Sequence, residues 1–173
     1  MPGPAVLQLE NPFWTFSLDV YARPGVAQEC LALQARYGID VNALLFCAWA
    51  GAMRRALLSK RQAAGIVAHV EAWQQRTVLP LRTVRQALKK MAAVGEPVTA
   101  LRKDVAAAEL KAEQIEQAML FGDAAALLDG ARATRAEEAV PANIACFLRH
   151  YAGAAEGLAD AALAFAAGHA DER

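Results

Sequence analysis

The clearest pattern in the chain is an apolar seam that stays in phase over about six helical turns. Its members are three or four residues apart, which is the spacing of one helix face. Pro80 lies within the seam, where it removes a backbone hydrogen bond and clashes with the carbonyl of Arg76. Because the seam continues beyond Pro80, it predicts one kinked helix over residues 60–93. The members of the seam are Ile66, Val70, Trp73, Thr77, Leu81, Val84 and Leu88.

Three helices are predicted before this seam from apolar faces bounded by capping residues. Asn11 and Asp40 are suitable N-caps, Ser59 begins the kinked helix, and Gly38 is a suitable C-terminal cap. The third helix is apolar nearly all round, which is typical of a buried central helix, and its Gly51 would let a neighbouring helix approach closely. The three helices are predicted over residues 12–22, 24–37 and 41–58.

Gly95 and Pro97 mark the main break in the chain. A helix is predicted after them over residues 98–121, with Leu101, Val105, Ala108, Ala112, Ile115 and Met119 facing inward. Shorter alanine-rich helices are predicted over residues 123–128, 141–152 and 158–167. No run alternates apolar and polar residues for long enough to indicate a strand. The sequence therefore predicts an all-α, compact bundle of six to eight helices with a long Pro-kinked central helix. Residues 1–95 form its core, and an acidic extension of residues 96–173 packs on them within one domain.

The composition and the cysteine content also indicate where in the cell the protein is located. Of the 173 residues 56% are hydrophobic, and the excess over an average protein is mostly alanine. The three cysteines, Cys30, Cys47 and Cys146, have apolar neighbours and an uneven spacing, so they are interpreted as buried thiols rather than disulfides. The N-terminus lacks the features of a signal peptide, and no stretch is long and apolar enough to span a bilayer. A cytoplasmic location without membrane association is predicted.

Charge is segregated along the chain although the net charge is zero. Residues 1–53 carry a net charge of −2, residues 54–103 of +9 and residues 104–173 of −7. In one interpretation the acidic helices pack beside the basic ones and the charges cancel. In the other, Arg82, Arg85 and Lys89 face solvent opposite the seam and bind an anionic partner such as an acidic protein surface, RNA or DNA. The neutral balance argues against a dedicated nucleic-acid module.

Common catalytic and metal-binding motifs are absent. The glycine-rich phosphate loops G-x-x-x-x-G-K-[ST] and G-x-G-x-x-G do not occur, nor does the nucleophile elbow G-x-S-x-G. Cys146 and His150 have a spacing that can present two zinc ligands, which Cys30, Cys47 and His69 could complete, but no CxxC or HExxH motif supports such a site. No metal and no cofactor are predicted, and an enzymatic role is not favoured.

Two sets of polar residues are candidates for a ligand site. His69, Trp73 and Arg76 lie with Pro80 along one flank of the kinked helix, where they could line a small polar cleft. The alternative is that His69 lies at the core boundary and Arg76 extends into solvent. Asn42 opens a very apolar helix and needs a hydrogen-bond partner if it is buried.

Three segments together resemble a family of small proteobacterial proteins classed as a domain of unknown function. They are residues 13–26, residues 37–45, and residues 73–89 with Pro80-Leu81-Arg82 at their centre. The resemblance covers about residues 10–95 and implies a bacterial, cytoplasmic origin, but no activity, substrate or cofactor. The polar and aromatic residues of these segments are Trp14, Asp19, Tyr21, Asp40, Asn42, Trp73, Arg82 and Arg85.

These observations lead to three functional hypotheses. The first is a non-enzymatic binding or adaptor protein that engages a protein partner through its basic central helix or its aromatic N-terminal helix. The second is a small-ligand-binding protein or enzyme, with a pocket near His69, Trp73, Arg76 and Asn42 to which Trp14 and Tyr21 contribute. The third and weakest is a nucleic-acid-binding protein. A homo-oligomer is compatible with each.

Overall fold

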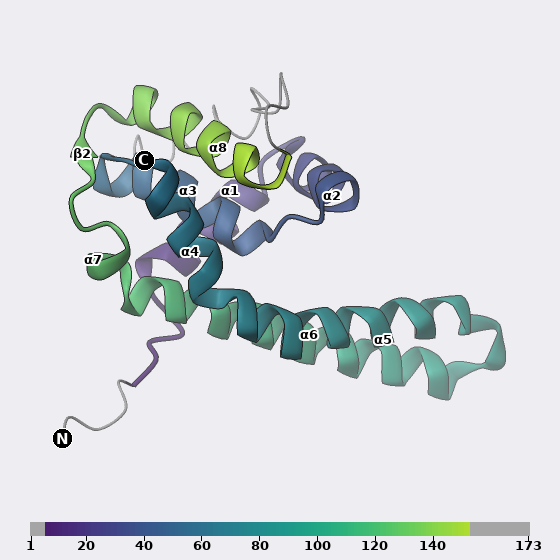
Figure 1. Ribbon diagram of the computed structural model, residues 1–173. Coiled ribbons are helices and arrows are strands. Elements are labelled where there is room, and N and C mark those ends of the chain that lie inside the picture. Colours follow the sequence, from purple (N-terminus) through teal and green to yellow (C-terminus); the bar gives the residue numbers. More distant parts are fainter. Residues whose placement is uncertain (1–5, 153–173) are drawn as a thin grey trace.

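Helices α1 to α8 make up most of the computed structural model, which describes residues 6–152 (Figure 1). Their bounds are α1 Pro12–Tyr21, α2 Val26–Tyr37, α3 Val41–Arg54, α4 Lys60–Trp73, α5 Leu79–Lys90, α6 Glu96–Gly122, α7 Ala124–Leu127 and α8 Ala136–Ala152. The prediction of an all-α bundle of six to eight helices is therefore confirmed. The predicted helix over residues 158–167 lies outside the described residues.

The capping residues predicted from the sequence begin and end these helices as expected. The Asn11 side chain accepts a hydrogen bond from the backbone N–H of Trp14 at 2.9 Å, and Asp40 accepts from Asn42 at 2.8 Å. Ser59 forms a reciprocal capping box with Gln62 at the start of α4. Gly38 ends α2 with φ 65°, a left-handed conformation that glycine adopts without strain.

A π-helical turn over Gln74–Val78 carries the kinked helix past its proline. The backbone N–H of Leu79 donates to the carbonyl of Gln74, five residues back, so the wider turn accommodates Pro80 without ending the helix. α4 and α5 run in clearly different directions on either side of this turn (Figure 1). The predicted Pro-kinked helix is thus confirmed, and it runs as one helical segment from Lys60 to Lys90.

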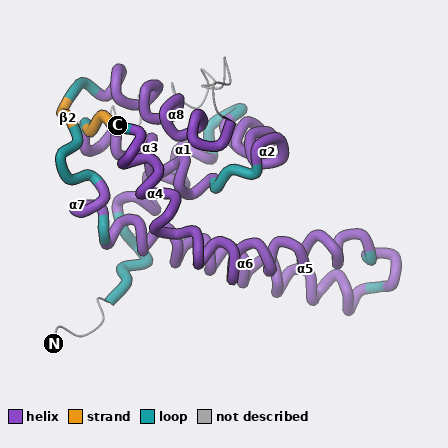
Figure 2. The backbone as a smooth tube through the Cα atoms, viewed as in Figure 1, coloured by secondary structure: helices purple, strands orange, loops and turns teal. Residues whose placement is uncertain are grey.

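Two very short strands correct the prediction that the chain has none. β1 (Ala56–Leu57) and β2 (Arg132–Ala133) pair antiparallel and are orange in Figure 2. They escape the sequence pattern because two residues are too few to show an alternation. β1 also ends α3 at Arg54, four residues before its predicted end.

Helix α3 is the centre of the core, as its all-round apolar pattern predicts. Residues 42–52 are all buried. Phe46 and Trp49 pack with Phe13 of α1 at centroid distances of 5.2–5.6 Å, and Trp49 also packs edge-on against Phe121 of α6. Gly51 faces the backbone of α8, and a Cβ placed there would lie 2.9 Å from the amide nitrogen of Val140. The predicted close approach at Gly51 is therefore confirmed.

The buried face of α6 differs from the predicted one. Of the residues predicted to face inward, Ala112 is buried, Leu101 (51%) and Ala108 are exposed, and the rest are half-buried, namely Val105, Ile115 and Met119. The other buried residues of α6 are Glu109, Gln114, Glu116, Gln117, Ala118 and Leu120. The prediction was wrong for Leu101 and Ala108, and it missed the buried polar residues, because it assigned burial by hydrophobicity alone. This face is held partly by ion pairs and amide hydrogen bonds.

Helices α5 and α6 form an antiparallel hairpin that projects from the rest of the molecule (Figures 1 and 2). The C-terminal half of α6 continues beneath the body, where it contacts α1, α3 and α4. The hairpin therefore brings the basic segment of the chain beside the acidic one. Within residues 6–152, no helix combines the length and hydrophobicity that crossing a membrane requires.

Candidate functional site

A cavity of about 330 Å³ lies where α1, α2 and α3 meet the base of the α5–α6 hairpin. We call it the central cavity. Five of the residues singled out from the sequence line it: Trp14, Tyr21, Asn42, Arg82 and Arg85. The other lining residues are Ser17, Leu18, Leu31, Gln34, Val41, Leu45, Ala106, Glu109, Leu110, Glu113 and Gln117.

Helix α1 builds one wall of the central cavity because it carries two neighbouring apolar stripes. Phe13, Phe16 and Val20 fill the core and are almost completely buried. The adjacent stripe, which holds Trp14, Leu18 and Tyr21, lines the cavity instead. Burial raises the pKa of the Tyr21 phenol, so this wall presents an uncharged hydroxyl among apolar groups.

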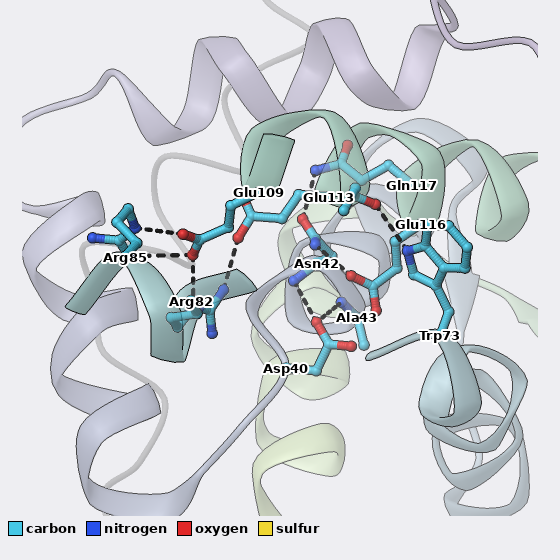
Figure 3. A network of polar contacts seen from close by, with 11 residues as sticks. Asp40, Asn42, Ala43, Trp73, Arg82, Arg85, Glu109, Glu113, Glu116 and Gln117 are labelled. Atoms are coloured by element: carbon cyan, nitrogen blue, oxygen red, sulfur yellow. Dashed lines mark hydrogen bonds and ion pairs between the residues drawn. The ribbon is translucent and has the colours of Figure 1, made fainter. Parts of the chain in front are cut away.

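The floor of the central cavity is a relay of amide side chains between α3 and α6 (Figure 3). Gln117 Nε2 donates to Asn42 Oδ1 at 2.9 Å, and Asn42 Nδ2 donates to Glu116 Oε2 at 2.8 Å. Asn42 thus has the partners that its burial requires. Within the part of the chain that the structure describes, Gln117 Oε1 accepts no hydrogen bond.

The relay ends at two buried carboxyl groups. Asp40 lies beside Glu116, whose side chain is fully shielded from solvent. The pKa of Glu116 is raised to about 10, mainly by burial and then by the charge of the neighbouring Asp40. Burial also raises the pKa of Asp40. The pair therefore retains a proton at neutral pH, and that proton lets two acceptor groups lie side by side.

Arginine–glutamate pairs connect α5 to α6 at the side of the cavity (Figure 3). Arg82 binds Glu109 at 2.9 Å and Glu113 at 2.7 Å, and Arg85 also binds Glu109. The interpretation that Arg82 and Arg85 face solvent was wrong, because the π turn adds a residue to the helix and turns them toward α6. Here the interpretation in which acidic and basic helices neutralise each other is the correct one.

These ion pairs fix the charges next to the cavity. Burial alone would raise the pKa of Glu109, but the hydrogen bonds from Arg85 and Arg82 outweigh it and lower that pKa. Burial raises the pKa of Glu113, opposed by the charge of Arg82. Two arginines and two glutamates therefore face one another without a large net charge.

The remaining candidate residues lie away from the central cavity. His69 Nε2 is 3.1 Å from Asp123 Oδ2, and Trp73 Nε1 donates to the carbonyl of Ala112 at 3.0 Å. Arg76 and Lys89 are exposed. None of His69, Trp73 and Arg76 therefore lines the central cavity with Asn42.

Four residues of the site were not identified from the sequence: Glu109, Glu113, Glu116 and Gln117. They lie in an acidic segment where carboxylates ordinarily indicate a solvated face. A signal was nevertheless present, because positions 109, 113 and 116 share one helix face at spacings of four and three. Acidic residues aligned on one face are compatible with a basic helix packed against them.

The cysteines and metal-ligating residues do not form a second site among the described residues. Cys30, Cys47 and Cys146 are free and buried, as predicted. Burial raises the pKa of Cys30 to about 12, so this thiol is not a nucleophile at neutral pH. No group of three or more His, Cys, Asp or Glu side chains within residues 6–152 is placed to hold a metal ion.

A second hollow, of about 620 Å³, lies on the other side of α2. Leu31, Gln34 and Arg82 line both it and the central cavity. The central cavity is the stronger candidate because its amide floor and its aromatic wall converge on one space.

Comparison with known proteins agrees with the resemblance noted from the sequence. The family model described as a protein of unknown function, DUF2390, matches residues 12–120, so the chain belongs to this family. The matched region contains every residue that lines the central cavity. No curated protein and no solved structure matches the chain.

Proposed function

We propose that this member of the family binds a small molecule with an apolar body and an uncharged hydrogen-bonding end in the central cavity. The observation that carries the proposal is the amide pair of Asn42 and Gln117 at the floor of a space whose walls are largely apolar. Ligand sites in proteins are typically concave and mostly apolar, with a few polar groups that fix orientation. The volume of about 330 Å³ lies within the range of such sites.

The charges beside the cavity indicate an uncharged ligand end. Arg82 and Arg85 are engaged by Glu109 and Glu113, so an anionic ligand would have to displace a carboxylate from a guanidinium. A cationic ligand would meet two arginines. A hydroxyl or primary amide avoids both costs. Gln117 Oε1 has no donor among the described residues and is buried, so such a group can donate to it once the Gln117 side chain turns toward the cavity.

The same ion pairs make partner binding through Arg82 and Arg85 the less favoured function. A protein or nucleic acid that used these side chains would have to compete with two glutamates on α6. Lys89 remains exposed, but a single lysine supplies little specificity. We also propose that the protein acts in the cytoplasm, because a reducing compartment keeps free thiols such as Cys30, Cys47 and Cys146 unpaired.

Native mass spectrometry of the protein purified without denaturation tests the proposal. Ala106 lines the cavity, and its neighbour Ala107 is exposed and does not line it. Ala106→Trp fills the cavity, and Ala107→Trp adds the same side chain outside it. We expect a small molecule bound to the natural protein and to Ala107→Trp but not to Ala106→Trp. Equal binding by both variants, with both folded by circular dichroism, would exclude this cavity as the site.

A further inference from the structure

The α5–α6 hairpin carries two apolar stripes that its own helices leave uncovered. We call this hairpin, residues 79–111, the arm; its base adjoins the body, and its tip projects away from the body in Figures 1 and 2. On α5 the stripe consists of Leu81, Val84, Leu88 and Met91. On α6 it consists of Leu101, Val105 and Ala108. Except for Met91, these are the positions that the periodicity assigns to the core.

The two stripes lie on the same side of the arm. On α5 the residues turned toward α6 are Arg82 and Arg85, and the apolar residues 81 and 84 precede each of them by one position. On α6 the residue turned toward α5 is Glu109, and Ala108 of the apolar stripe comes one position before it. One position rotates a side chain by about 100° around a helix. In each helix the apolar stripe is therefore rotated by about 100° from the contact between α5 and α6. Because the two helices run antiparallel, these rotations point both stripes to the same face of the arm.

Of the side chains of this face, Leu81, Leu88 and Val105 are half-buried and the others are exposed. Val84 is 47% exposed, Met91 50% and Leu101 51%. A helix that buries apolar residues on one side normally packs them against a further layer, and a two-helix hairpin has none to offer. Contiguous exposed apolar surface on a folded protein commonly marks an interaction site.

We propose that the occupant of this face is the same face of a second copy of the chain, packed antiparallel to form a four-helix bundle. In a two-fold symmetric interface each patch must complement itself. Antiparallel packing places α6 of one copy along α6 of the other. Along α6, the edge of the apolar face carries Asp104 and Lys111, which are both exposed and are seven residues apart. A two-fold axis between them brings Asp104 of each copy next to Lys111 of the other.

The tip of the arm favours the antiparallel arrangement over the parallel one. Lys89, Lys90 and Lys103 are exposed there, with Arg102 half-buried and Glu96 as the nearby acid. Parallel packing would bring the two basic tips together, whereas antiparallel packing separates them along the length of the arms. This proposal does not depend on ligand binding in the central cavity.

Sedimentation equilibrium over a range of protein concentrations tests the dimer. The unmodified protein is expected to be dimeric, and Val84→Glu/Leu101→Glu to be monomeric because it places charges in the face. Gln86→Glu is the matched control, since it adds a carboxylate to the exposed surface of α5 outside the stripe. Circular dichroism confirms that each variant is folded. A natural protein that remains monomeric, or a dimer that the double substitution leaves intact, would overturn the proposal.

Charge exchange tests the antiparallel arrangement. Asp104→Lys and Lys111→Asp are each expected to raise the dimer dissociation constant about tenfold, because each replaces two attractive pairs with two repulsive ones. The double variant Asp104→Lys/Lys111→Asp restores both pairs and is expected to recover most of the affinity. A double variant that dimerises no better than the single variants would contradict this arrangement.

Discussion

At the scale of single residues, the carboxyl of Glu116 is the most unusual group in the structure. It is fully buried, accepts a hydrogen bond from Asn42, and lies against the carboxyl of Asp40. Two ionised carboxylates in such a place would repel each other and lack solvent. The shared proton therefore contributes both to the fold and to the orientation of the amide relay at the cavity floor.

This proton makes stability depend on pH in a defined direction. Unfolding returns the pKa of Glu116 from about 10 to 4.5, so between these values the folded chain binds more protons than the unfolded chain. Stability is then greatest below the lower value and falls as pH rises toward the upper one, by at most about 1.4 kcal/mol per pH unit. Glu116→Gln removes this ionisation and keeps a neutral hydrogen-bonding side chain.

Urea unfolding at several pH values measures the effect. We expect the free energy of unfolding of the natural protein to fall more steeply between about pH 5 and about pH 9 than that of Glu116→Gln. The difference between the two proteins should be smallest at the acidic end. Parallel pH profiles would show that Glu116 ionises normally in the folded chain.

The sequence supplied half of this cluster. Asn42 was identifiable as a residue that needs a partner, and Asp40 as a helix cap, because both follow from local rules. Glu116 and Gln117 lie more than seventy residues further along the chain, and no local pattern connects them to Asn42. Their identity depends on tertiary packing, which periodicity does not encode.

At the scale of the elements, the contact between α3 and α8 depends on one glycine. Gly51→Ala would place a Cβ at 2.9–3.0 Å from backbone atoms of Ala139 and Val140, which cannot move without displacing α8. Gly65, on the exposed side of α4, has nothing within 4 Å of such a Cβ.

We expect Gly51→Ala to lower the free energy of unfolding by about 1–3 kcal/mol or more, as overpacking a core does. Gly65→Ala should raise it by up to about 1 kcal/mol, because alanine is the better helix former. Thermal and urea denaturation measure both variants. A Gly51→Ala protein as stable as the natural one would show that α8 does not pack this closely on α3.

The element boundaries show where local patterns succeed and where they stop. Capping residues predicted most helix starts closely, because a cap is a local interaction. The phase of the kinked helix was predictable only as far as Trp73, because the π turn inserts one residue and rotates everything after it. Val78 is therefore completely buried, while Val84, a member of the predicted seam, is 47% exposed.

The pairing of α5 with α6 gives a prediction at the same scale. Arg82 holds two glutamates, and Glu109 is only 7% exposed in its side chain, so Arg82→Ala leaves a nearly buried carboxylate with fewer partners. We expect a loss of about 2–4 kcal/mol in unfolding free energy.

Lys89→Ala, on the same helix but exposed, is the matched control and should change stability by less than about 0.5 kcal/mol. Equal, small effects of both substitutions would mean that the arginine–glutamate pairs do not hold α5 against α6.

At the scale of the whole molecule, the fold divides into a body around α3 and an arm formed by α5 and α6 (Figure 1). The central cavity lies where the two meet, and its lining comes from two separate stretches of the chain, one holding α1 to α3 and the other α5 and α6. The sequence predicted the all-α class and singled out five of the residues that line the cavity. It could not predict that they share one cavity, because that depends on how the arm is seated against α1 and α3.

The most direct test of the central claim is a nuclear magnetic resonance titration that follows the three tryptophan indole N–H signals. Trp14 lines the cavity, whereas Trp49 lies in the core and Trp73 is bonded to the carbonyl of Ala112. Small alcohols, phenols and primary amides are added as probes. We predict that the signals of Trp14 and of the Asn42 and Gln117 side-chain amides shift while those of Trp49 and Trp73 remain in place. Shifts confined to Trp73, or none at any of these groups, would contradict a ligand site in the central cavity.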